Sequence, residues 1–375
     1  MRKLFVMFVL LGVLMPLTGS PARANGPYAP LIIAIRSNGE LPSYYHDDLW
    51  LWDGTGEPRQ LTSYLYNGAP IISPDNRYVA YLSTPKVFLQ ALKIGGGRSG
   101  VPPSNIWLMT IPDGDAIRIA DQPKEAIVDE EAILSVGIER SQPTWSPDGT
   151  KLAWTEITEL HNAPADEQRL MIYDLASGKT RTVITLPVYQ IGSATPLWSE
   201  AGIALVANDV NGNSVVEIYD EQGHLISKQP FEGGDSDMRG VKGSDGKEYL
   251  GSRKSLIDSS TDTAQPIPAS LALHSRTSAA GLFAEQRIGD DGNWTLHDGD
   301  MTQVIGSENY PVEWLAISPR GDAIAYVQHD DTSLALLVKL YQHGEITTIV
   351  TLSEIAAPRF IDGLAWGAIE WRVMP

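Results

Sequence analysis

Apolar and polar residues alternate over short stretches of this chain, most clearly within residues 141–156. Leu152 and Trp154 alternate there with Lys151 and Thr155. This period of two is expected of a β-strand with one face buried. The pattern therefore predicts a short β-strand at this point.

A tight turn precedes the strand at residues 146–149, Ser-Pro-Asp-Gly. Proline presets φ at the second position, aspartate bonds to nearby backbone amides, and glycine accepts a positive φ. Trp145 stands directly before the turn, and Trp198 and Trp314 hold similar places elsewhere in the chain. We predict that these three tryptophans lie in the core.

Copies of this strand-turn-strand unit recur along the chain. Clear copies begin at Ile72 and Ile317, a weaker one begins at Trp198, and those at Ser244 and Ser278 are degenerate. A second pair of strands joined by a glycine turn follows most copies. Four-stranded units repeated every 40 to 50 residues or so are the signature of a β-propeller.

We therefore predict an all-β fold, a seven-bladed β-propeller of four-stranded antiparallel blades. Six blades are the alternative if residues 235–268 form an embellishment. The first blade lacks an inner strand at its start, and residues 360–366 are predicted to supply it, which would remove free sheet edges. The other blades are expected at 66–121, 140–187, 193–231, 235–268, 269–306 and 311–352.

A family resemblance rests on residues 143–154, Pro-x-Trp-Ser-Pro-Asp-Gly-x-x-Leu-Ala-Trp. This pattern resembles the WD40-like Pro-Asp repeat of TolB-like bacterial propellers, which also occurs in the propeller domains of prolyl oligopeptidase relatives. The resemblance implies the fold and is silent on chemistry, because the repeat supplies turn and core residues. TolB-like proteins carry a further domain ahead of the propeller, so their envelope partner is not transferred.

The first residues have the pattern of a secretory signal peptide. A basic start at residues 1–3 precedes an apolar run from Leu4 to Leu17 and the small-x-small sequence at residues 22–24. The apolar run is short for a membrane span. We predict a signal peptide over residues 1–24, a single propeller domain over 25–375, a secreted or periplasmic location, and no transmembrane segment in the mature chain.

Composition narrows the classes of partner. The absence of cysteine from all 375 residues excludes a lipid-anchored cysteine, disulfides and thiolate metal sites. A net charge of −18 argues against nucleic acid, whose phosphates would be repelled. The acidity either keeps a secreted protein soluble or attracts a cation or a basic partner.

The long insertions are expected on one face, where the connections between second and third strands and the links between blades emerge. Insertions confined to one face mark a binding face. A short helix is expected within residues 124–138 of one link. Phe88 is expected to add contact surface. The predicted binding face consists of Tyr44, Tyr45, Asp47, Asp48, Asp166, Glu167, Asp290, Asp291, Asp330 and Asp331. Solvated acidic loops without a partner are the alternative.

Twin His-Asp-Asp triplets begin at His46 and His329, in loops of blades that a closed ring makes neighbours. Imidazole with carboxylates suits Zn²⁺ or Mn²⁺, and carboxylates alone suit Ca²⁺. The candidate metal ligands are His46, Asp47, His329 and Asp330, with coincidence as the alternative. We predict that no cofactor is required and keep a divalent cation as the alternative.

Catalytic signatures do not assign an enzyme. The sequence contains neither a Gly-x-Ser-x-Gly nucleophile elbow nor a His-x-x-x-His zinc helix. We predict a monomeric, non-enzymatic binding protein that engages a protein or cell-envelope component, including a cationic one, through its long-loop face. The alternative is a glycoside hydrolase or polysaccharide lyase with carboxylates at the channel mouth.

Overall fold

The computed structural model describes the strand framework and the turns that join it. The described residues are 30–37, 47–54, 56–63, 66–86, 88, 103–123, 136–160, 167–187, 195–208, 211, 213–230, 239–242, 248–251, 255–258, 263–266, 276–277, 282–285, 293–307, 312–317, 323–329, 336–352 and 359–365. The predicted signal peptide lies outside these ranges and stays a prediction. Within them, no helix has the length and apolar character needed to cross a membrane.

The strands form antiparallel sheets, called blades, in which neighbouring strands are hydrogen-bonded to each other. One sheet has the order β29 (Arg359–Ala365), β1 (Leu31–Ser37), β2 (Asp47–Trp52) and β3 (Arg59–Gln60). The next has the order β4 (Asn67–Ile72), β5 (Tyr78–Ser83), β6 (Asn105–Thr110) and β7 (Ala116–Ala120). In the following sheet β12 (Lys179–Pro187) pairs with β11 (Glu167–Asp174), β11 with β10 (Lys151–Leu160), and β10 with both β8 (Val136–Arg140) and β9 (Thr144–Trp145).

The remaining blades each take their strands in chain order. The first is β13 (Leu197–Ser199), β14 (Gly202–Asn208), β15 (Ser214–Tyr219) and β16 (Leu225–Pro230). The second is β17 (Arg239–Lys242), β18 (Glu248–Gly251), β19 (Ser255–Asp258) and β20 (Thr263–Pro266). The third is β21 (Arg276–Thr277), β22 (Leu282–Glu285), β23 (Trp294–Asp298) and β24 (Met301–Ile305). The last is β25 (Val312–Ile317), β26 (Ile324–His329), β27 (Leu336–Gln342) and β28 (Glu345–Leu352).

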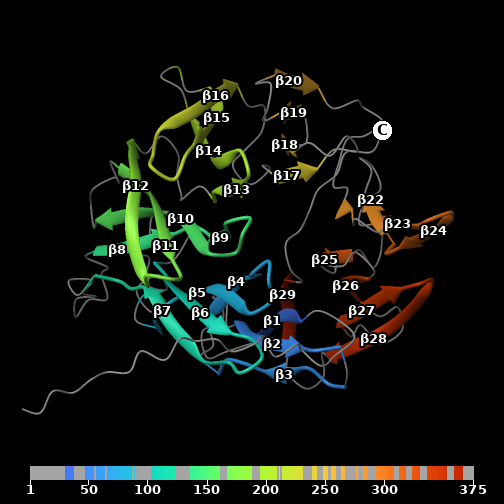
Figure 1. Cartoon of the computed structure of the whole chain (residues 1–375). Coiled ribbons are helices and arrows are strands. Elements are labelled where there is room, and N and C mark those ends of the chain that lie inside the picture. The colour runs from blue at the N-terminus through green and yellow to red at the C-terminus, as the bar shows by residue number, and fades with distance from the viewer. Residues whose placement is uncertain are drawn as a thin grey trace, which may run out of the picture.

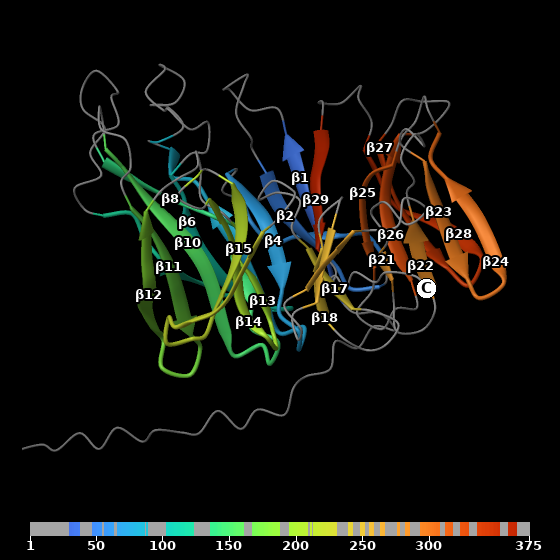
Figure 2. The same ribbon diagram turned by 90° about the horizontal axis from the view of Figure 1, so that it is seen from above.

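The blades are arranged in a ring around a common axis (Figure 1). Inner strands such as β4, β13, β25 and β29 lie near the axis, and the last strand of each blade lies at the periphery. Seen from the second direction, the strands run between the two faces of the ring (Figure 2). The predicted all-β architecture of antiparallel sheets is confirmed. Six of the described sheets have the predicted four strands, and the β8–β12 sheet has five, because β8 and β9 both pair with β10.

The Ser-Pro-Asp-Gly turn has the geometry that its residues predict. The Ser146 hydroxyl lies 2.6 Å from Oδ1 of Asp148 and accepts the Lys151 amide at 2.9 Å, and Gly149 has φ of 70°. The copy at Ser73 and Asp75 repeats the 2.6 Å contact between side chains. Each turn therefore fixes the register of the strands on both sides of it.

The segment from Phe360 supplies the missing inner strand, as predicted. β29 pairs with β1 in antiparallel register, so that Ile32 lies opposite Ala365 and Arg36 opposite Phe360. Strands from distant parts of the chain thus share one sheet.

Apolar side chains of adjacent blades pack against each other. One cluster joins Ile32 and Leu49 to Val79 and Tyr81, and another joins Ala80, Ile106 and Leu108 to Leu152 and Trp154. Burying these faces supplies the main stabilising term, about 25 cal/mol per Å² of apolar surface.

The tryptophan prediction is confirmed for Trp145, which is 8% exposed. Trp198 is only partly buried and packs against the cluster around Ala153. Trp314 lies in β25, and its side chain is outside the description.

The expected helix within residues 124–138 is wrong for its last part, because Val136–Arg140 form strand β8. The reason is that β10 continues to Leu160 and offers its inner edge, where Thr158 lies opposite Ile138. Pairing with that edge satisfies backbone groups that a helix would leave to solvent.

Candidate binding face

The strands run up and down, so successive connections alternate between the two faces of the ring. The β4–β5 turn spans only residues 73–77, and the β11–β12 turn only 175–178. The β5–β6 connection, 84–104, and the β7–β8 connection, 121–135, begin and end at the opposite face and are the longest between consecutive strands. We call this side the long-loop face. Both of these connections belong to the β4–β7 blade.

Most of the predicted face residues fall outside the described ranges. They are Tyr44, Tyr45, Asp166, Asp290, Asp291, Asp330 and Asp331. Two others lie at strand ends that border the long-loop face, since Asp47 begins β2 and Glu167 begins β11. His329, a candidate metal ligand, ends β26 on the same side. Glu167 is exposed, and His329 is half-buried. The binding-face prediction therefore stays a prediction, with these three strand ends placed on one side of the ring.

Asp48, another predicted face residue, differs from Glu167 because it is buried, with 5% of its surface exposed. Its Oδ1 accepts a hydrogen bond from the Thr62 hydroxyl at 3.0 Å, and its Oδ2 accepts one from Nε2 of Gln60 at 3.0 Å. The Thr62 oxygen in turn accepts hydrogen bonds from the Leu49 amide and from Nδ2 of Asn67. Asp48 thus joins the β1–β3 blade to the start of β4 and presents little charge to solvent.

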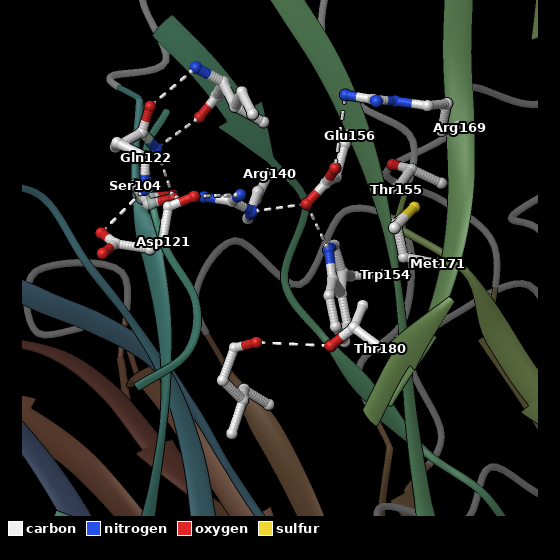
Figure 3. Close-up of polar contacts among 12 residues, drawn as sticks. Ser104, Asp121, Gln122, Arg140, Trp154, Thr155, Glu156, Arg169, Met171 and Thr180 are labelled. Atoms are coloured by element: carbon white, nitrogen blue, oxygen red, sulfur yellow. Dashed lines mark hydrogen bonds and ion pairs between the residues drawn. The ribbon is translucent and has the colours of Figure 1, made fainter. Parts of the chain in front are cut away.

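A buried ion pair lies on the other side of the β4–β7 blade (Figure 3). Nε of Arg140 donates to Oε1 of Glu156 at 2.7 Å, and the two side chains are 3% and 6% exposed. Trp154 donates its indole N–H to the same oxygen at 3.1 Å, and Nη2 of Arg169 lies 3.5 Å from Oε2. Three donors therefore surround one carboxylate, as a buried charge requires.

Burial lowers the pKa of the Arg140 guanidinium, and the neighbouring Glu156 carboxylate opposes that shift. The ordinary pKa of arginine lies so far above neutral pH that the group stays charged. A charged guanidinium spreads its N–H donors in a fixed plane. Arg140 can therefore bind Glu156 and two backbone carbonyls at once.

Those two carbonyls lie at the roots of the long connections. Arg140 donates from Nη1 to the Ser104 carbonyl at 2.5 Å and from Nη2 to the Asp121 carbonyl at 2.8 Å. The Gln122 amide donates to the Ser104 and Ile138 carbonyls, both at 2.9 Å, and accepts the Ile138 N–H at 2.8 Å. We call Ser104, Asp121, Gln122, Ile138, Arg140 and Glu156 the clamp. It ties the end of connection 84–104 to both ends of connection 121–135.

Two polar atoms beside the clamp have no hydrogen-bond partner within the described ranges. They are Oγ of Ser104 and Oδ1 of Asn105, on residues that are 3% and 5% exposed. Buried polar atoms are nearly always bonded. The root of the 84–104 connection thus keeps unused hydrogen-bonding capacity.

Sequence reasoning missed the clamp, although one signal was present. Leu152, Trp154 and Glu156 alternate along β10, so Glu156 follows two core residues on the same face and its charge needs a buried partner. The expectation that Phe88 adds contact surface is wrong, because its side chain is 2% exposed and packs inward near the start of the 84–104 connection.

The metal prediction is not settled by the described side chains. His46 and Asp330 lie outside the description, as does the side chain of Asp47. Among the described residues, no three His, Asp or Glu side chains are grouped closely enough to hold an ion.

No protein-family model matches the sequence. No curated protein matches it either. Solved structures do resemble the fold. The acylaminoacyl peptidase of Pyrococcus horikoshii aligns with 86% of this chain and 51% of its own, at 14% identity and a TM-score of 0.56. Dihydro-heme d1 dehydrogenase NirN aligns over 93% of this chain and 78% of its own, at 14% identity and a TM-score of 0.50.

The β-propeller domain of the trilobed protease from Pyrococcus furiosus aligns over 86% of this chain and 92% of that domain, at 14% identity and a TM-score of 0.54. Likeness at such identity establishes the fold and no activity. The chain is a β-propeller, and it spans about half the length of the acylaminoacyl peptidase that it resembles. The trilobed-protease propeller has an open velcro topology, whereas in this chain β29 pairs with β1.

Proposed function

We propose that this chain is an extracytoplasmic, seven-bladed β-propeller that binds a protein or cell-envelope component through the long-loop face. Each sheet of the structure corresponds to one blade in this proposal. The main observation in support of this proposal is the clamp, because the clamp holds the ends of the two longest connections against each other.

Fixing loop roots favours binding for an energetic reason. Ordering a loop upon binding opposes association, and pre-ordering its ends lowers that cost. Arg140 and Gln122 together hold carbonyls of Ser104, Asp121 and Ile138. A partner that contacts both connections therefore meets two segments whose ends are already held together.

The charge of the chain points to the chemistry of the partner. A net charge of −18 attracts cationic surfaces and steers their approach. Asp47 and Glu167 border the long-loop face, and the acidic pairs predicted for its loops would add to them. A basic protein surface is the proposed partner, and a divalent cation held by His46, Asp47, His329 and Asp330 is a secondary proposal.

The proposal is tested with matched charge reversals on the two faces. Glu167→Lys alters the long-loop face, and Asp113→Lys places the same change at an exposed position on the opposite face. Tagged mature protein is incubated with an envelope extract of its host, cross-linked, and its partners are quantified by mass spectrometry. We expect Glu167→Lys to lose partners that Asp113→Lys retains. Equal retention by both variants would overturn the assignment of the face.

A carbohydrate-active enzyme was the sequence-based alternative. No observation on the described residues favours a glycoside hydrolase or a polysaccharide lyase, so that alternative is not proposed.

A further inference from the structure

Among the strands that the structure describes, the last strand of each blade pairs on one side only and leaves a free edge at the periphery of the ring. Such an edge offers unpaired N–H and C=O groups that can pair with another chain. Proteins blunt these edges with very short strands, charged residues, prolines or bulges. The terminal strands of the sheets are β3, β7, β12, β16, β20, β24 and β28.

All but one of these strands carry a blunting feature. β3 has only 2 residues. Charge or proline protects the other five, through Arg118 in β7, Lys179, Arg181 and Pro187 in β12, Lys228 and Pro230 in β16, Pro266 in β20 and Glu345 in β28. Register shifts further interrupt β6–β7, β11–β12, β15–β16 and β27–β28 pairing.

β24 lacks every one of these features. Its sequence, Met-Thr-Gln-Val-Ile, contains no charge and no proline, and its pairing with β23 runs from Asp298–Met301 to Trp294–Ile305 without a shift. Val304 is 62% exposed and Met301 is 51% exposed. Both views place β24 at the outer rim (Figures 1 and 2). The strand is regular, uncharged and partly apolar, which suits strand addition.

Acidic residues gather at the turn end of β24. Asp300 directly precedes the strand and is exposed. The Met301 methyl group lies 3.5 Å from the position that a Cβ atom on Gly344 would occupy. Gly344 belongs to the turn directly before Glu345, so the exposed Glu345 also lies close to this end of β24. A cation on a bound segment would be favoured at this end.

We propose that the free edge of β24 binds an extended segment of another protein, with uncharged β-branched side chains along the strand and a Lys or Arg at the end that lies beside Asp300. Main-chain hydrogen bonds supply affinity in this mode, and alternate side chains supply specificity. The net charge of −18 on each molecule disfavours a second copy as the occupant. This surface is separate from the long-loop face.

The test uses the full mature chain and a fluorescein-labelled peptide, acetyl-Lys-Thr-Val-Thr-Val-Thr-amide, followed by fluorescence anisotropy. We expect saturable binding that Val304→Lys weakens by about tenfold or more. A tenfold loss corresponds to about 1.4 kcal/mol of binding free energy. Ile117→Lys is the matched control, because Ile117 is 55% exposed on the outer strand β7, which Arg118 already protects. That variant should bind the peptide as the parent does.

A second comparison isolates the charge. Asp300→Asn should weaken binding of the lysine peptide and leave a peptide with glutamine in place of lysine unaffected. Melting temperatures of all variants should match the parent, since each change is on the surface. Failure of the peptide to bind saturably, or equal loss with Ile117→Lys, would overturn the proposal. Sedimentation that shows self-association abolished by Val304→Lys would overturn it in favour of a second copy.

Discussion

The two sides of the β4–β7 blade are built alike in their apolar parts and differently at their polar ends. Toward the β1–β3 blade, Val79 and Tyr81 pack on Ile32, and the interface ends at Asp48, whose carboxylate accepts hydrogen bonds from Gln60 and Thr62. Toward the β8–β12 blade, the apolar cluster ends at a buried ion pair. The ends of the two longest connections, 84–104 and 121–135, meet on the side that faces the β8–β12 blade.

The difference separates packing from positioning. Apolar burial is non-directional and holds blades together wherever their faces match. An ion pair with three further hydrogen bonds holds only one geometry, and removing one partner leaves an uncompensated charge. The β8–β12 side is therefore the one whose geometry is most strongly specified.

Arg140→Met should have the largest effect, since it leaves Glu156 buried without its main partner. We expect a loss of about 3 to 5 kcal/mol in the free energy of unfolding. Urea denaturation at neutral pH measures the loss.

The double variant Arg140→Met, Glu156→Leu removes both charges and should recover most of that stability, because apolar replacement of a buried pair is often neutral. Stability that stays as low as in the single variant would show that Arg140 acts chiefly through the Ser104 and Asp121 carbonyls.

Asp48→Ala tests the weaker side. It removes the acceptor of the Thr62 hydroxyl and the Gln60 amide, and unmade hydrogen bonds of this kind cost about 1 to 3 kcal/mol. Urea denaturation should show a smaller loss than for Arg140→Met. Glu57→Ala, at an exposed position near the same blade, is the control and should leave stability unchanged. A loss equal to that of Arg140→Met would erase the contrast between the two sides.

The smallest effect is expected at the turn of the β8–β12 blade. The Ser146 hydroxyl, with the Thr150 amide, lowers the pKa of Asp148 below its usual value of 3.8. A lowered folded-state pKa contributes stability above the unfolded pKa and loses it as pH falls through the folded value. Asp148→Asn should therefore cost about 0.5 kcal/mol or less near pH 7, given solvent screening, and nothing near pH 2. Urea melts at both pH values would show whether the cost vanishes in acid.

The repeat could be predicted from sequence because its determinants are local. Ser146, Asp148 and Gly149 specify their turn within a few residues, and Leu152 and Trp154 mark the buried face of the next strand. Even the strand contributed by residues from Phe360 could be inferred, since it fills a gap left in the repeat.

The clamp could not be predicted in the same way, since its partners are distant in sequence. Arg140 reaches the Ser104 carbonyl across 36 positions, and backbone carbonyls carry no residue signature. Strand β8 could not be predicted for a related reason. It pairs with residues 156–160 of β10, which extend beyond the repeat, and the repeat pattern does not indicate that extension. The burial of Asp48 likewise depends on Gln60 and Thr62 from the next segment.

The pairing of β29 with β1 bears on how the molecule is made. Ile32 lies opposite Ala365, so this sheet joins residues that leave the ribosome far apart in time. Contacts of such long range close slowly, because the chain entropy must be lost before the contact forms. Until then β1 keeps an open inner edge, the kind of surface that chaperones protect. We therefore expect that shielding β1 until β29 is synthesised favours correct assembly of this sheet.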